Sequence, residues 1–353
     1  MTASLETRIA DELSQGGRVL VTRLLYLGDT ILTLPAVDAI KRHYPNAEVD
    51  YAARGAGADV LCGEPAFGMV FKIPEKEEGT RAMWRTLRQL RQRRYSVAID
   101  YFSNPRSALM VWLTRARMRI GGDRRVRRRL YTHPITTPPE IRRASEHHLY
   151  YLHPLGIGVA GESTKPTLNI SMAEREGAAA VLRSAGIDSD KPAVGIHPGG
   201  KWEVKRWPVN RFTELAGRLL SRSLQLVVMI GPGEERFQSE LRDHIGDRAI
   251  YLPTLPIRDT AAIIEALDGV VVCDGGIMHV AVAVGTPTVG IFGSAEPDIW
   301  FPYEEHGPYA PAWLDIECRP CHSHVCDHLS CLRGLTAEAV EEKLLDVMRG
   351  GVS

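Results

Sequence analysis

An aspartate that follows a short apolar run is the first residue of this chain with an evident chemical use. Residues 19–22 are β-forming and predict a buried strand, Gly28 and Asp29 interrupt the pattern, and apolar residues return at helical spacing from Ile31. Open α/β sheets place ligands and chemistry at such strand-to-helix turns. Asp29 could therefore take part in such chemistry, or it could only cap the helix, because Asp is a favoured N-cap residue.

The second half of the chain repeats this arrangement, with glycines and basic residues in place of the carboxylate. His197 ends an apolar run, Gly199 and Gly200 follow it, and Lys205 comes shortly before a second helical pattern. Glycine lets a backbone approach a phosphate, and the free N–H groups of a helix start bind anions. The alternative is an ordinary glycine-rich turn with a solvated basic face.

Two later turns of the same kind carry carboxylates. Glu234 could accept hydrogen bonds from ribose hydroxyls, or it could be a favourable charge in the first turn of a helix. Asp274 could bind sugar hydroxyls, and Gly275 and Gly276 after it suit the close approach of a sugar or phosphate. His279 lies in the helix that follows, where a single histidine is more often a core residue.

Two series of alternating strands and helices must position these residues. The expected strands cover residues 19–22, 49–52, 70–73, 97–100 and 119–121 in the first half, and 193–197, 226–230, 270–273 and 288–292 in the second. Residues 156–167 between them are rich in Gly, Ser and Thr and predict a linker. Two such series predict an α/β protein of two doubly wound domains that face each other across a cleft.

The charges are unevenly distributed along a chain whose formal net charge is zero. Residues 1–165 hold 26 Lys and Arg against 17 Asp and Glu, a net of +9, and the remaining residues carry the balancing −9. The basic excess peaks around Arg124, Arg125, Arg127 and Arg128. This cluster could be a solvated face, or it could bind an anionic partner such as nucleic acid, acidic lipid or acidic sugar. Aromatic residues are sparse there, which argues against a platform for single-stranded nucleic acid.

No stretch of the sequence predicts a membrane span or a secretion signal. The composition, 44% hydrophobic and 24% charged, is that of an ordinary globular protein. The first twenty residues lack a continuous apolar core, and the most apolar window, residues 269–293, is interrupted by Asp274, His279 and Pro287. We therefore expect a cytoplasmic protein.

Four of the six cysteines fall within fourteen residues. Their spacing is Cys318-x2-Cys321-x4-Cys326-x4-Cys331. In a cytosolic chain this pattern favours a metal over a disulfide, and zinc with a structural role is the candidate. The alternative is four free thiols in a loop. Cys62 and Cys273 stand alone and are interpreted as packing residues.

Taken in order, the motifs resemble glycosyltransferase family 9, the ADP-heptose:lipopolysaccharide heptosyltransferases. They are Leu27-Gly28-Asp29 with Thr33-Leu34-Pro35, His197-Pro198-Gly199 with Lys205-Arg206-Trp207-Pro208, Asp274-Gly275-Gly276 with His279, and Gly285-Thr286-Pro287-Thr288 with Phe292-Gly293. The resemblance covers nearly the whole chain, and the ordered set is more specific than any single motif.

The resemblance implies a GT-B architecture with two Rossmann-like domains. Residues 1–165 would bind the acceptor and residues 166–335 the nucleotide sugar, and residues 336–353 would form a helix that packs back toward the N-terminal domain. Transfer would invert the anomeric centre without a catalytic metal. Roles carried over by resemblance are a catalytic base at Asp29, diphosphate contacts at Gly199 and Gly200, donor contacts at Lys205, Asp274, Gly275, Gly276 and His279, ribose binding at Glu234, and an adenine-side position near Leu255.

The chain departs from the family pattern at its glycines. Gly275 stands where many members have Ser or Thr, and Gly199 and Gly200 replace hydroxyl residues of some heptosyltransferases. Backbone N–H contacts would survive these changes, but the identity of the donor is left open.

The expected reaction is the transfer of heptose from ADP-heptose to a Kdo or heptose residue of the lipopolysaccharide inner core. The basic half, with Arg124, Arg125, Arg127 and Arg128, would hold this anionic acceptor at the cytoplasmic face of the inner membrane, and no nucleic acid partner is expected. One alternative is a family member that uses another nucleotide sugar for a different surface glycan. A nicotinamide dehydrogenase is disfavoured because no G-x-G-x-x-G follows the first strand. A non-enzymatic protein that binds an anionic polymer is the third possibility.

Overall fold

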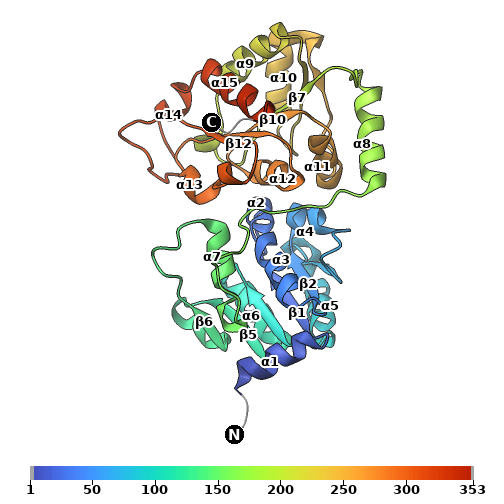
Figure 1. Ribbon diagram of the computed structural model, residues 1–353, viewed down its shortest axis with the longest axis vertical. Coiled ribbons are helices and arrows are strands. Elements are labelled where there is room, and N and C mark those ends of the chain that lie inside the picture. The colour runs from blue at the N-terminus through green and yellow to red at the C-terminus, as the bar shows by residue number, and fades with distance from the viewer. Residues whose placement is uncertain (1–3, 351–353) are drawn as a thin grey trace. The chain divides into compact units, whose positions relative to one another are not determined.

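The chain folds into two compact units. The computed structural model describes residues 4–350, and the units comprise Met1–Pro166 and Thr167–Ser353 (Figure 1). Their boundary falls at the end of the segment expected to be a linker. Within the described residues, none of the helices has both the length and the apolar character that a membrane crossing requires.

The first unit is built on a six-stranded parallel sheet with the spatial order β3-β2-β1-β4-β5-β6. Its strands are β1 (Arg18–Thr22), β2 (Glu48–Ala53), β3 (Val70–Lys72), β4 (Val97–Asp100), β5 (Met118–Gly122) and β6 (His133–Ile135). Val19 in β1 pairs with Val49 on one side and with Val97 on the other. From β1 the strand order runs outward through β2 and β3, and from β4 it runs in the opposite direction through β5 and β6. The topological switch point therefore lies between β1 and β4.

The second unit repeats this plan with the spatial order β12-β11-β10-β7-β8-β9. Its strands are β7 (Ala193–His197), β8 (Gln225–Val228), β9 (Ile250–Tyr251), β10 (Gly269–Cys273), β11 (Thr288–Ile291) and β12 (Tyr309–Ala312). All neighbouring strands are parallel. Here the switch point lies between β7 and β10.

Helices cover both faces of each sheet. The first unit contains α1 (Leu5–Ser14), α2 (Leu27–Ile31), α3 (Leu34–His43), α4 (Gly55–Leu61), α5 (Gly79–Gln92), α6 (Pro105–Thr114) and α7 (Ala144–Tyr150). The second contains α8 (Met172–Ser184), α9 (Val209–Ser221), α10 (Glu235–Ile245), α11 (Ile257–Glu265), α12 (Gly276–Val284), α13 (Pro297–Trp300), α14 (Ser330–Arg333) and α15 (Ala337–Met348). Apolar residues from the strands and from the helices above them form a continuous core in each unit.

The helices on one face of the first sheet show how sequence fixes these elements. α6 begins where Asn104 accepts a hydrogen bond from the backbone N–H of Ser107 at 2.8 Å, with Pro105 at the first helical position. Its buried Ala108 and Val111 then pack with Leu90 of α5 in one core cluster. The burial of this apolar stripe supplies most of the stability of such short helices.

The last helix belongs to the second unit. Val340, Leu344 and Val347 of α15 are buried in the core that contains Phe212 of α9 and Val289 of β11. Within the described residues these contacts hold α15 to the sheet of the second unit. The expectation that residues 336–353 pack back toward the N-terminal domain stays a prediction.

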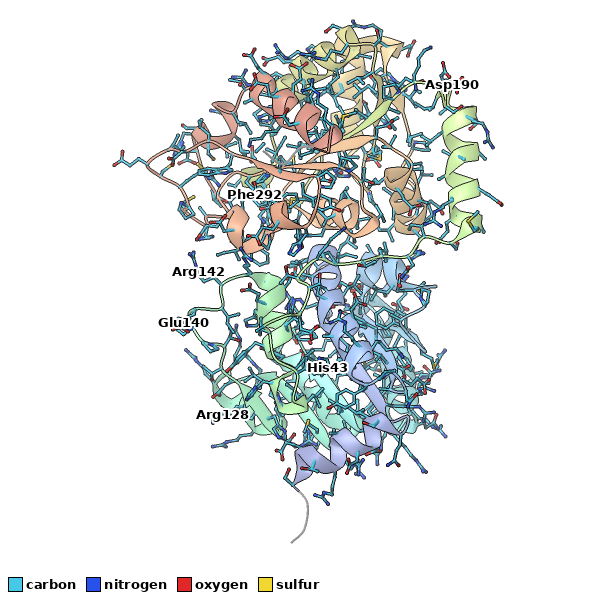
Figure 2. The ribbon with its side chains drawn as sticks, viewed as in Figure 1. His43, Arg128, Glu140, Arg142, Asp190 and Phe292 are labelled. Carbon is cyan, nitrogen blue, oxygen red and sulfur yellow. The ribbon has the colours of Figure 1, made fainter. Side chains whose placement is uncertain are left out.

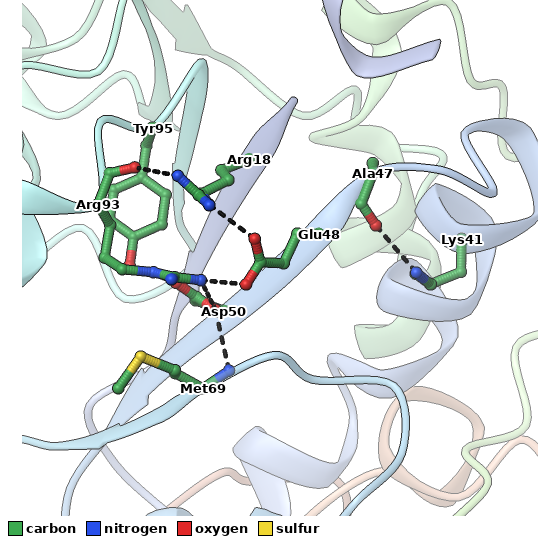
Figure 3. Close-up of polar contacts among 8 residues, drawn as sticks. All are labelled: Arg18, Lys41, Ala47, Glu48, Asp50, Met69, Arg93 and Tyr95. Atoms are coloured by element: carbon green, nitrogen blue, oxygen red, sulfur yellow. Dashed lines mark hydrogen bonds and ion pairs between the residues drawn. The ribbon is translucent and has the colours of Figure 1, made fainter. Parts of the chain in front are cut away.

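A charged network holds the first sheet together near the start of its strands (Figure 3). Asp50 of β2 is fully buried and accepts hydrogen bonds from Arg93 Nε at 2.8 Å, Tyr95 Oη at 2.7 Å and the Met69 N–H at 2.9 Å. Glu48 pairs with both Arg93 and Arg18. Burial of a carboxylate is tolerated because it is fully hydrogen-bonded and paired.

Candidate active site

Asp29 lies at the switch point of the first sheet and is paired with an arginine. Arg23 directly follows β1, and its guanidinium forms an ion pair with the Asp29 carboxylate. A second nitrogen of the same guanidinium donates to the Tyr101 carbonyl at 2.8 Å, just after β4. Arg23 therefore ties Asp29 to both strands that flank the switch point, where doubly wound sheets bind their ligands.

The carboxylate of Asp29 also takes part in the start of a helix. Asp29 is the third residue of α2, and its other oxygen accepts a 3.3 Å hydrogen bond from the Tyr26 N–H. The helix-start interpretation is thus correct in part, with Asp29 at the third position and not at the N-cap. About one fifth of its side chain remains exposed, so a substrate hydroxyl can still reach the carboxylate.

Aromatic and basic side chains surround this pair. Arg23 lies over the Phe102 ring at 4.9 Å, and Tyr101 packs edge-on against His148 of α7. The neighbouring His147 has its pKa lowered by burial first, and then by the positive charges of Arg124 and Arg23. His147 is therefore neutral at physiological pH and close to both arginines.

Among the four arginines expected to bind the acceptor, only Arg124 is tied to Asp29's surroundings by an interaction of the described residues. It immediately precedes the short 3₁₀ segment Arg125–Leu130, and its charge acts on His147. Arg128 instead pairs with Asp123 at 3.3 Å and projects from the surface of this unit (Figure 2). Arg125 is exposed, and Arg127 is partly buried. Of the four, Arg124 therefore lies near the surroundings of Asp29, whereas the described residues show no such link for Arg125, Arg127 or Arg128.

Asp100, which ends β4, is not available to a substrate. It is fully buried, and its oxygens accept hydrogen bonds from Tyr131 Oη at 2.7 Å and from the N–H groups of Phe102 and Ser103. Burial raises the pKa of this carboxyl group, and these hydrogen bonds oppose the rise. Its role is to shape the turn after β4, so of Asp29 and Asp100 only Asp29 is accessible to a substrate.

In the second unit, Lys205 and Asp274 meet at the switch point. Lys205 ends a 3₁₀ turn after β7, Asp274 follows β10, and their Nζ and Oδ2 atoms are 2.7 Å apart. Trp207 anchors the lysine segment, because its buried indole donates to the Leu335 carbonyl and its backbone N–H contacts Cys273 Sγ. A lysine and a carboxylate therefore occupy the edge where a charged sugar donor would be expected.

Glu234 occupies the backbone N–H groups of the two glycine turns beside this pair. Its oxygens accept from the Gly200 N–H at 2.7 Å and from the Gly231 N–H at 2.8 Å. A Cβ atom at Gly199 would overlap the Glu234 carboxylate, so only glycine fits there in this arrangement. Two N–H groups that converge on a carboxylate are a ready anion site.

His197 is a buried neighbour of Glu234. Its Nε2 atom lies 3.6 Å from Glu234 Oε2, and its side chain is buried. Burial lowers the pKa of His197, and the negative charge of Glu234 opposes that change. The neutral His197 therefore packs against Glu234, and the backbone N–H groups of Gly200 and Gly231 are the donors of the anion site.

The other residues expected to contact the donor differ in burial and in their contacts. Gly275 is the N-cap of α12, and a Cβ atom there would meet nothing closer than the Cys273 carbonyl at 3.7 Å. His279 is buried, contacts Tyr303 Oη at 3.3 Å, and has its pKa lowered to about 3, first by burial and then by the charge of Lys205. Leu255 is partly exposed in the loop between β9 and α11. Gly276 begins α12.

The four clustered cysteines line one cavity together with Arg319. Within the described part of the chain, however, no three His, Cys, Asp or Glu side chains are arranged to hold a metal ion. The predicted structural zinc site is therefore unsupported, and the geometry matches four free thiols. Of the two isolated cysteines, Cys273 is a packing residue, and burial raises the pKa of its thiol to about 12. Cys62 is exposed, so the packing prediction was wrong there.

The sequence matches the profile of glycosyltransferase family 9 (heptosyltransferase) over residues 83–331. The chain belongs to this family. It is 27% identical over 88% of its length, and 88% of the relative's, to a Pseudomonas aeruginosa protein named lipopolysaccharide heptosyltransferase 1.

Family 9 structures share the fold. A Veillonella parvula member superposes with a TM-score of 0.82 at 20% identity, covering 95% of this chain and 98% of that one. The Escherichia coli ADP-heptose lipopolysaccharide heptosyltransferase II gives 0.78 at 22% identity, over 94% and 98%. The predicted GT-B class, with two Rossmann-like domains, is thus confirmed, and the chain is a glycosyltransferase.

Sequence reasoning missed Arg23 and His147. Arg23 carried a weak signal, because a basic residue directly after the first strand stands six positions before the candidate base. His147 carried none, since its place beside Arg23 and Arg124 depends on how α7 packs.

Proposed function

We propose that this family 9 enzyme transfers heptose from ADP-heptose to a Kdo or heptose residue of the lipopolysaccharide inner core, with inversion at the anomeric carbon. The observation that carries the proposal is the position of the charged pairs. Asp29 with Arg23, and Lys205 with Asp274, each lie at the switch point of one Rossmann-like sheet. Family membership supplies the reaction class.

In the proposed step, Asp29 takes the proton from the acceptor hydroxyl while that oxygen bonds to the anomeric carbon. The bond from this carbon to the diphosphate breaks at the same time, and ADP leaves with the electron pair. Arg23 is a positioning residue that holds the carboxylate. A sugar hydroxyl is a poor nucleophile until its proton is removed, and general-base assistance contributes roughly 10²–10⁴-fold.

The proposed donor contacts use groups that are paired with each other in the described chain: Lys205 with Asp274, and Glu234 with the Gly200 N–H. Lys205 would leave Asp274 to contact the diphosphate, and Asp274 would then be available to sugar hydroxyls. Glu234 would release the N–H group of Gly200 to the phosphates and accept from the ribose. Each exchange replaces one charged contact with another, so an anionic donor can compete with the carboxylates for Lys205 and for the Gly200 N–H group.

The acceptor is proposed to be anionic and attached to a membrane. Arg124, whose charge acts on His147 together with that of Arg23, and the +9 charge of residues 1–165 favour a substrate rich in carboxylates and phosphates. We place the enzyme in the cytoplasm, in peripheral contact with the inner membrane, and assign no step of transfer to a metal.

A transfer assay with purified enzyme tests the donor and the acceptor together. ADP-heptose is compared with ADP-glucose, UDP-glucose and GDP-mannose, and each is offered to acceptors that end in Kdo or in the first heptose. We expect product only from ADP-heptose, on one of these acceptors. A donor other than ADP-heptose would instead favour a different surface glycan, an outcome that the glycines at 199, 200 and 275 leave room for. No transfer with any donor, alongside tight binding of anionic polymers, would contradict an enzymatic role.

A further inference from the structure

The first unit carries an exposed apolar groove that takes no part in the proposed reaction. It runs between α5 and α6, and Leu87 and Leu113 line it along its length. Trp84 of α5 is 66% exposed beside it, and Leu109 and Trp112 of α6 are each 48% exposed. Two tryptophans on adjacent helices thus leave half or more of their surface exposed, which marks a surface that another structure covers.

Arginines flank this groove. Residues 79–119 contain ten arginines and a single acidic residue, Asp100, which is buried. Arg88, Arg91 and Arg94 contribute to the lining beside Trp84. Among the described residues, ion pairs are formed by Arg93 with Glu48 and Asp50 and by Arg117 with Glu12, but none is formed by the six exposed arginines of this surface. These six are Arg81, Arg85, Arg88, Arg91, Arg94 and Arg115.

The helical spacing separates the two kinds of side chain. On α5, Thr86 and Leu90 face the core, Met83 and Leu87 face the groove, and Trp84 lies next to them toward the solvent. The arginines occupy the rest of the exposed face. A tryptophan beside an apolar groove, bordered by unpaired arginines, matches the interface of an anionic bilayer, where indole rings sit at headgroup level and basic residues contact lipid phosphates.

We propose that this surface, called here the α5–α6 face and comprising Trp84, Leu87, Arg88, Leu109, Trp112 and Leu113, docks on an anionic lipid bilayer. Charge complementarity favours this occupant over a second copy of the chain, because two copies would bring the unpaired arginines together. The end of the groove lined by Ile73 and Arg106 lies where β3 ends and α6 begins. That is the same edge of the sheet at which β1 leads to Asp29, so docking would hold a lipid-linked acceptor near the candidate base.

Vesicle sedimentation tests the proposal with the full chain and no acceptor or donor present. The protein is mixed with vesicles of phosphatidylcholine alone, or of phosphatidylcholine with phosphatidylglycerol, at low salt. We expect binding only to the vesicles with phosphatidylglycerol. Since each basic residue near an anionic surface contributes about 1 kcal/mol, Arg88→Ser with Arg91→Ser should weaken binding on the order of thirtyfold. Trp84→Ser with Trp112→Ser should weaken it as well.

Matched controls separate this surface from general charge effects. Arg8→Ser with Arg183→Ser removes two exposed arginines from α1 and α8 and should leave binding unchanged. Thermal melting verifies that each variant is folded. Equal binding to neutral vesicles, no binding of the wild type, or an equal loss in the control would overturn the proposal. A lipid-free dimer that the tryptophan variants abolish would assign the surface to a second copy and overturn it too. The proposal extends the membrane contact of the proposed function, but its failure leaves the transfer reaction untouched, because vesicle binding needs neither substrate.

Discussion

At the scale of single residues, Asp29 combines two roles that a substitution can separate. Its carboxylate both pairs with Arg23 and accepts from the Tyr26 N–H at the start of α2. Asn can keep the helix-start hydrogen bond, but it cannot accept a proton. We therefore expect Asp29→Asn to fold normally and bind donor normally, with kcat reduced by roughly 10²–10⁴-fold. Measurement of kcat, donor affinity and melting temperature on one preparation checks this.

The control for Asp29 is Arg23→Lys. A lysine keeps the positive charge but cannot reach Asp29 and the Tyr101 carbonyl together. We expect a smaller loss of kcat than in Asp29→Asn, with little change in donor affinity. Retained kcat in folded Asp29→Asn would remove this carboxylate from the mechanism. Since Asp100 is buried and satisfied, a different accessible base would then be required.

Two glycines expected to contact the donor should differ in their response to serine. Gly199→Ser would displace Glu234 from the Gly200 and Gly231 N–H groups, and hydrogen bonds to a charged group are worth about 1.5–3 kcal/mol. We expect a lower melting temperature and weaker ADP binding. Gly275→Ser has space and sits at an N-cap, where Ser is at least as favourable as Gly, so both quantities should stay near wild type. Equal effects of the two substitutions would contradict the assigned position of Glu234.

At the scale of elements, α3 contains a carboxylate whose environment opposes its charge. Burial, and then the negative charge of Glu64, raise the pKa of Asp38 to about 6, whereas in the unfolded chain it is about 3.9. The folded state therefore binds more protons between these values, and stability rises as pH falls through this window. We expect Asp38→Asn to stabilise the protein by about 1–3 kcal/mol at pH 7.5. The gain should shrink as pH falls through this window and disappear near pH 3, which is below both values.

Melting temperatures of the wild type and Asp38→Asn across this pH range provide the check. The difference between the two proteins isolates Asp38 from the other titrating groups. A gain that stays constant with pH would mean that the substitution acts through packing and not through the charge.

The sequence predicted the central strands and the edge strand β3, but it missed the other edge strands. The apolar runs at residues 97–100 and 193–197 became β4 and β7 with the same bounds, because buried parallel strands are continuous and apolar. The edge strands β6, β9 and β12 were not predicted. They are short, and β12 contains Pro311, which suits an edge but weakens the strand signal. Their pairing is decided by the neighbouring strand and not by their own residues.

The same distinction explains the candidate site. Asp29, Glu234 and Asp274 could be found because each stands in a turn after an apolar strand, a position that the fold class assigns to ligands. The residues that pair with them could not be found in this way. The ion pairs of Asp29 with Arg23 and of Asp274 with Lys205 depend on which strands become neighbours. The orientation of Glu234 toward Gly200 likewise depends on the order of β7 and β8 in the sheet.

At the scale of the whole molecule, the charge difference between the two halves should be visible in kinetics. Residues 1–165 carry +9, and attraction between exposed charges is screened over about 10 Å at 0.1 M salt. We expect the acceptor KM to rise with salt, while the donor KM changes less. Replacing Arg124, Arg125, Arg127 and Arg128 by Ser should raise the acceptor KM at low salt and flatten its salt dependence.

The individual arginines refine this expectation. The charge of Arg124 acts on His147, as does that of Arg23, the partner of Asp29, whereas Arg128 is already paired with Asp123. Arg124→Ser should therefore account for more of the rise in acceptor KM than Arg128→Ser, whose charge is largely compensated. Initial rates at several salt concentrations, with acceptor and donor varied in turn, measure both effects. An unchanged acceptor KM at low salt in the fourfold variant would make the cluster an ordinary solvated surface, and equal effects of the two single variants would leave no special place for Arg124.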